Sequence, residues 1–204
     1  MSRYVDDMKR AIVTYRDTKQ KVEARYNEIK ELYGEEAVQR EKERQEKQLK
    51  NARAAAEAAI REAYSEGHYL AEQWGKPDGS RLTDDMKLFD AGLVTPEVFD
   101  QLKGRYSDNA TMLSALKAQG EKLNAAASQA DREKGGLGVV EPYNTRDIQT
   151  GADKLKNWDS MKKQALDVLD MIDGSGQYRD PWNKAFGAAM GAEIIEHFGE
   201  GSGL

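Results

Sequence analysis

Residues 5–33 read VDDMKRAIVTYRDTKQKVEARYNEIKELY, and the spacing of the apolar residues in this stretch decides the fold. Alternating steps of three and four residues connect nine positions, which is the a/d pattern of a heptad repeat sustained over four repeats. The pattern predicts a long amphipathic helix with one apolar stripe. That stripe, called the seam below, comprises Val5, Met8, Ile12, Tyr15, Lys19, Val22, Tyr26, Ile29 and Tyr33.

The seam has two interpretations. Either it packs within its own domain, or it forms a coiled coil with a second chain or with the next helix. Lys19 is its one polar member, and a polar a-position residue can specify register and partner, although a solvated lysine is the simpler account. Pairing with a second chain makes the protein a homo-oligomer, and replacing Ile12 and Val22 with Asp is then expected to abolish self-association.

The residues after Gly34 leave the course of the helix open. Either Gly34 ends the first helix and a second returns antiparallel to it, or one helix continues to about Gln73. Residues 39–53 (QREKERQEKQLKNAR) hold six basic and three acidic side chains. Such a run is typical of a solvated helix face, and it lacks the interleaved aromatic residues of a single-strand binder. An alanine-rich stretch follows, and residues 75–80 (GKPDGS) interrupt the helix.

The remaining sequence predicts short helices. Thr83 is expected to cap a helix that ends at Gly92. Thr95 with Pro96 has the pattern of an N-cap followed by proline at N1, and Asp108 or Asn109 caps the next helix. A further helix is expected over about 152–172. Beyond Asp180-Pro181, a last helix is expected to carry Trp182, Phe186, Met190, Ile194 and Phe198 on one stripe.

The fold class predicted is therefore all-α, with a long heptad-bearing N-terminal helix or helical hairpin followed by a small helical bundle. Residues 1–74 are expected to form a coiled-coil-like arm and residues 75–204 a helical body. A single Val139-Val140 stub of strand does not make a sheet. The charged fraction of 33% and the hydrophobic fraction of 39% suit elongated helices with one apolar stripe.

Several kinds of chemistry lack a signal. The chain has no cysteine, so disulfides and thiolate metal sites are excluded. Its two histidines, His68 and His197, have no histidine neighbour at helical spacing. We expect no catalytic residues, no metal, no cofactor and no enzyme activity. The first residues lack an apolar signal segment, and no run reaches the ~20 apolar residues of a membrane span. The expected location is the host cytoplasm or the virion.

The charge is unevenly distributed. Residues 1–74 are neutral overall, so the later residues carry the whole net charge of −5. This argues against binding nucleic acid over the whole surface, and it allows an acidic mimic of nucleic acid that occupies a basic groove. The candidate acidic face comprises Asp167, Asp170, Asp173, Glu193 and Glu196.

Three segments, 88–92 (LFDAG), 95–102 (TPEVFDQL) and 106–116 (YSDNATMLSAL), resemble parts of uncharacterised proteins encoded by phages and prophages of Gram-positive bacteria. The resemblance covers about 30 of 204 residues and has no catalytic residue to transfer. It implies a phage origin. The expected function is protein–protein contact in virion structure or assembly. The alternatives are an inhibitor of a host enzyme or defence nuclease, and direct binding of nucleic acid through residues 40–53.

Overall fold

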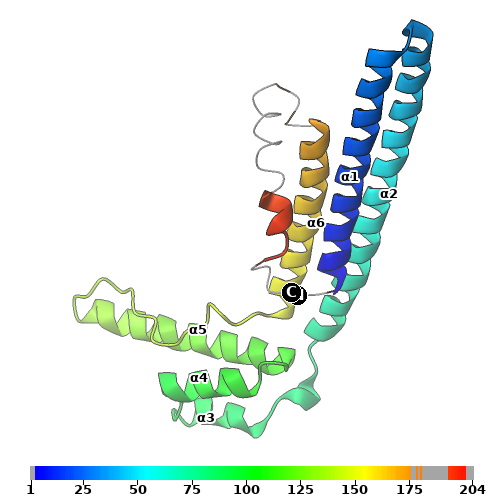
Figure 1. The fold of residues 1–204 in the computed structure, drawn as a ribbon. Helices are drawn as coiled ribbons and strands as arrows, with labels where there is room; N and C mark the ends of the chain where they lie inside the picture. Colours follow the sequence, from blue (N-terminus) through cyan, green and yellow to red (C-terminus); the bar gives the residue numbers. More distant parts are fainter. Residues whose placement is uncertain (1–2, 176–177, 179, 181–192, 201–204) are drawn as a thin grey trace. The chain divides into compact units, whose positions relative to one another are not determined.

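The computed structural model describes residues 3–175, 178, 180 and 193–200, and it confirms the all-α fold. The predicted stripe of the last helix lies outside the described residues at Trp182, Phe186 and Met190. Figure 1 shows the elements, which are α1 (Arg3–Leu32), α2 (Glu35–Gly75), two 3-10 turns (Gly79–Arg81 and Asp84–Met86), α3 (Lys87–Asp90), α4 (Pro96–Arg105), α5 (Ala110–Glu133) and α6 (Gly151–Asp173).

The chain divides into two compact units. Unit 1 comprises Met1–Tyr69 with Asn157–Leu204, and unit 2 comprises Leu70–Lys156. This division differs from the expected arm of residues 1–74 and body of residues 75–204, because most of α6 belongs with α1 and α2. The physical reason is that the seam requires more apolar cover than the alanine-rich α2 supplies. α6 contributes to that cover with Trp158, which packs against Tyr4 of α1 and against α2 at Gly67.

In unit 1 the helix breaks at Gly34, so the antiparallel hairpin is the correct alternative. α1 ends at Leu32 and α2 begins at Glu35. Arg25 and Glu41 form an ion pair across the hairpin, with 3.2 Å between guanidinium and carboxylate. Figure 1 shows α1, α2 and α6 side by side in this unit. The seam contributes to the core through Val5, Met8, Ile12, Tyr15 and Val22, which are all buried.

Gly67 of α2 allows a close helix contact in this core. A Cβ atom at this position would collide with the indole of Trp158. Trp158 is buried, and its ring packs edge-on against Tyr4 with 6.4 Å between centroids. A glycine inside a helix costs about 1 kcal/mol relative to alanine. The contact with Trp158 explains why this position has glycine.

We expect Gly67→Ala to lower the free energy of unfolding of unit 1 by about 1–2 kcal/mol, because overpacking outweighs the gain in helix propensity. Gly104 of α4 is the matched control, since a Cβ atom there would meet nothing within 4 Å. Gly104→Ala is expected to stabilise unit 2 by about 0.5–1 kcal/mol. Urea denaturation of both variants measures the difference. Equal stabilisation by the two substitutions would contradict the contact with Trp158.

Unit 2 has a separate core around Phe99. The Phe99 ring packs edge-on against Phe89 and Tyr143, with centroid separations of 6.4 and 5.6 Å. A Cβ atom on Gly120 would lie 2.7 Å from the same ring, so α5 approaches α4 closely at this glycine. The buried members of this core are Val94, Phe99, Leu102, Leu113, Leu116 and Ile148.

The predicted helix caps of unit 2 are confirmed at two of three positions. The Thr95 side chain accepts a hydrogen bond from the Val98 amide, and Asn109 accepts one from the Met112 amide. Thr83 makes no capping bond, and its hydroxyl lies 2.8 Å from the hydroxyl of Tyr106. The helix expected from this threonine to Gly92 is consequently a 3-10 turn followed by the single turn α3.

The backbone at Val139-Val140, where a stub of strand was expected, forms hydrogen bonds with helix α5 rather than with another strand. The hydroxyl of Ser128 in α5 donates to the Val140 carbonyl at 2.8 Å and accepts from the Val140 amide at 3.2 Å. One turn earlier, the Asn124 side chain bonds both the carbonyl and the amide of Tyr143. Two polar side chains of α5 thus satisfy the backbone of this extended segment.

Candidate interaction surface

A network of charged and polar groups surrounds the C-terminal end of α6 in unit 1. The Arg53 guanidinium donates to Asp170 at 2.5 Å and also to Asp173. Asp173 accepts a further hydrogen bond from the Tyr15 hydroxyl. The Lys19 ammonium donates to the carbonyl of Ile172 at 2.6 Å and lies 3.7 Å from the Asp173 carboxylate. Helices α1, α2 and α6 are therefore connected at one point.

This network sets the ionisation of its members. Burial raises the pKa of Tyr15 above its usual value, and the hydrogen bond to Asp173 raises it further, so the hydroxyl stays a donor. Burial alone lowers the pKa of Arg53, but its hydrogen bonds to Asp173 and Asp170 more than offset this and leave the pKa raised. A half-buried cation is thus matched to two carboxylates.

Lys19 has a structural reason to interrupt the apolar seam. Its ammonium reaches an unpaired carbonyl in the last turn of α6, where the helix macrodipole favours a cation. Lys19 therefore pairs α1 with α6 of the same chain. The Lys19 side chain is 16% exposed and bonded within its own chain, so the interpretation as a solvated lysine is wrong.

The candidate acidic face is not one free surface. Asp170 and Asp173 are bound by Arg53, and Asp173 also lies beside Lys19. Asp167 lines a separate pocket on α6, while Glu193 and Glu196 are exposed. Two of the five carboxylates are thus neutralised inside the chain, which removes support from the interpretation as an acidic mimic of nucleic acid.

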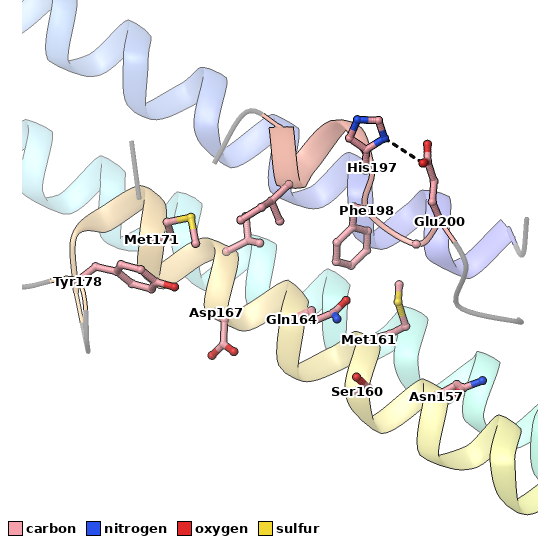
Figure 2. A pocket seen from close by; sticks show the side chains of 13 residues that line it. Asn157, Ser160, Met161, Gln164, Asp167, Met171, Tyr178, His197, Phe198 and Glu200 are labelled. Atoms are coloured by element: carbon pink, nitrogen blue, oxygen red, sulfur yellow. Dashed lines mark hydrogen bonds and ion pairs between the residues drawn. The ribbon is translucent and has the colours of Figure 1, made fainter. Parts of the chain in front are cut away.

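The pocket on α6 holds a histidine–carboxylate pair (Figure 2). His197 Nδ1 and Glu200 lie 2.9 Å apart, and this hydrogen bond raises the pKa of the histidine. Figure 2 shows this pair at the edge of the pocket, with Ser160, Gln164 and Asp167 following the face of α6. Within the described residues, no group of three or more His, Cys, Asp and Glu side chains is placed to hold a metal ion.

The distal end of the hairpin extends beyond α6. α6 ends at Asp173, whose partners Tyr15 and Lys19 lie near the middle of α1. From Lys19, α1 continues to Leu32, which is about 20 Å at 1.5 Å per residue. Figure 1 shows both hairpin helices continuing past the end of α6. Within the described residues, this distal part is a two-helix ribbon without a third helix.

The seam continues onto this uncovered part. Tyr26 and Ile29 are only half-buried, and Tyr33 is 61% exposed. Leu32, which the spacing of the seam omits, is 67% exposed beside them. We call these four residues, Tyr26, Ile29, Leu32 and Tyr33, the distal surface.

A groove lined by apolar and charged side chains belongs to this surface. Ile29, Tyr33 and Ala37 lie in it among charged side chains of both hairpin helices. The Glu41 carboxylate, whose side chain is only 11% exposed, lies 3.2 Å from Arg25 and 3.8 Å from Arg44. Tyrosine and arginine around an apolar centre are enriched at protein–protein interfaces. The full lining is Arg25, Glu28, Ile29, Tyr33, Ala37, Arg40, Glu41 and Arg44.

The structure thus divides the predicted seam into two parts. Its first part, with Lys19, is the internal core of unit 1, and its last three members lie on the distal surface. Sequence reasoning missed the role of Arg53, although a signal was present. Arg53 falls in the apolar stripe of α2, four residues after Leu49 and seven before Ile60, where a cation requires a partner.

No helix among the described residues is long and apolar enough to cross a membrane. The chain matches no protein-family model, no curated protein and no solved structure.

Proposed function

We propose that this protein acts by protein–protein contact rather than by catalysis, with the distal surface as its docking site, in virion structure or assembly. One observation carries the proposal. α1 continues about 20 Å past the end of α6, and there Tyr33 of the seam and the neighbouring Leu32 are mostly exposed. An apolar stripe on a helix gains stability only when another element covers it.

The energetics favour cover by a partner. Full burial of a leucine side chain contributes about 1.5–3 kcal/mol relative to exposure, and aromatic side chains bury even more area. Arg25 and Arg44 add guanidinium donors to this groove, and both are paired with the one carboxylate of Glu41 among the described residues. A partner that covers Leu32 and Tyr33 would therefore gain apolar burial at the centre and polar contacts at the edge.

The phage context comes from the resemblance at residues 88–116, and it remains part of the proposal. An acidic mimic of nucleic acid has less support, because Arg53 already binds Asp170 and Asp173.

Tyr33→Asp tests the docking site. Tyr69→Asp is the matched control, because Tyr69 lies in the same unit and is 58% exposed against 61% for Tyr33. In a tagged pull-down from phage-infected cells, we expect wild-type protein and the control to retain capsid, portal or tail components, or untagged copies of the same chain. Tyr33→Asp is expected to lose at least nine-tenths of this material, as measured by quantitative mass spectrometry, with an unchanged circular dichroism spectrum.

Equal recovery by wild type and Tyr33→Asp would overturn the distal surface as the docking site. Recovery of a host nuclease alone would overturn the assembly function.

A further inference from the structure

We infer that the partner of the distal surface is a second copy of this chain, bound antiparallel about a two-fold axis. This inference rests on the proposed function and identifies the partner. Three observations support it. One side of α1 is exposed, that side carries residues of opposite charge, and the hairpin extends beyond the end of α6.

The open side of α1 carries one acidic and one basic residue. Glu23 and Lys30 follow Lys9 and Arg16 at intervals of seven residues, so all four lie on one side of the helix. α2 lies along a different side, where Ala11 and Thr18 line a groove together with alanines of α2 and Arg25 pairs with Glu41. Nearer the N-terminus, Lys9 donates to the carbonyl of Glu196 in the C-terminal part of unit 1.

Among the residues that the structure describes, cover on this side ends before the two charges. α6 stops at Asp173, beside Lys19. Glu23 and Lys30 are exposed, and Glu23 has one loose pairing, 3.7 Å from Lys19. Both residues are therefore available to a second chain that lies along the seam.

An antiparallel register satisfies apolar and charged positions together. When Tyr26 packs against Ile29 of the second copy, as a and d positions do in antiparallel helix pairs, Tyr33 of the second copy lies level with Val22, which its own chain already buries. The same register brings Glu23 close to Lys30 of the second copy. Two-fold symmetry repeats each of these contacts, so the interface holds two opposite-charge pairs.

The parallel arrangement is disfavoured by the same charges. In a parallel pair, the residue that precedes an a position of one helix lies near the residue that follows the next d position of the other helix. Arg25 precedes the a position Tyr26, and Lys30 follows the d position Ile29. Arg25 would then approach Lys30 of the second copy, and symmetry would repeat this repulsion. The charge pattern of α1 therefore selects the antiparallel orientation.

The uncovered length fits the second hairpin. In this register the tip of the second copy, at its Tyr33, lies beside Val22, which is less than one turn beyond Lys19. The second hairpin thus fills the ribbon up to the end of α6 without overlapping it. A contact of this length is short for a stable interface, so we expect a concentration-dependent dimer with a Kd of about 10–100 μM.

A charge exchange in the full-length chain tests the pairing. Glu23→Lys and Lys30→Glu each place like charges at both contacts, and each is expected to weaken dimerisation at least tenfold in sedimentation velocity. An equimolar mixture of the two variants is expected to recover wild-type affinity as a heterodimer, because both contacts then pair opposite charges. Glu31→Lys is the control. It makes the same charge change as Glu23→Lys, but Glu31 lies on the side of the helix that faces away from the seam.

The outcomes separate the inference from the function on which it rests. A mixture that fails to recover dimerisation, or a wild-type protein that remains monomeric at 500 μM, would overturn the antiparallel dimer. The antiparallel dimer would also be overturned if the chain is monomeric and captures a different protein in a way that requires Tyr33. The docking function of the distal surface would then stand. Loss of dimerisation in Tyr33→Asp together with recovery in the mixture would support both.

Discussion

Ile12→Asp is expected to abolish the folded state of unit 1, whereas Ile29→Asp on the same helix and seam leaves it folded. Ile12 is fully buried, and Ile29 is half-buried on the distal surface. Deleting a buried isoleucine side chain costs about 2–5 kcal/mol. Burying an unpaired carboxylate adds several kcal/mol. The sum exceeds about 5 kcal/mol, which is comparable to the whole stability of a typical domain.

Circular dichroism and urea denaturation of the two variants measure this contrast. Ile12→Asp should lose cooperative unfolding of unit 1, while Ile29→Asp should keep it with a loss below about 1 kcal/mol. Loss of self-association in Ile12→Asp would then reflect unfolding rather than a missing contact. A folded Ile12→Asp protein would show that the seam is not the core of this unit.

Arg53→Met is expected to destabilise unit 1 by about 2 kcal/mol. The substitution keeps the aliphatic packing of the side chain but leaves the carboxylates of Asp170 and Asp173 without their main cation. Removing one partner of a fully buried ion pair costs about 3–5 kcal/mol, and the partial exposure of this network reduces that figure. Thermal and urea denaturation provide the measurement.

Arg40→Met is the control for this effect. Arg40 lies on the same helix, but its ion pair with Glu36 is on the solvent side, so we expect a change within about 0.5 kcal/mol. Adding Asp173→Asn to Arg53→Met should recover part of the lost stability, because one unpaired charge is then removed. Equal effects of the two arginine substitutions would contradict a structural role of the network at the end of α6.

The sequence by itself determined the helices and several of their ends. Apolar residues at helical spacing specify α1, because only a helix brings positions three and four residues apart to one side. Thr95 and Asn109 specify the starts of α4 and α5, because their side chains satisfy amides that the helix leaves unpaired. These signals are local, and each one is visible within a few residues.

Only the tertiary structure decided what covers the seam. The heptad pattern shows which side of α1 is apolar, but it carries no information on whether α2, α6 or a second chain packs there. The break at Gly34 was open for the same reason, since local propensity allows both a long helix and a hairpin. The return of α6, more than 100 residues later in the chain, provides the cover. α6 ends before Gly174, which has a positive φ of 62°. That end point separates the buried core from the exposed distal surface, and it depends on packing between segments that are distant in the sequence.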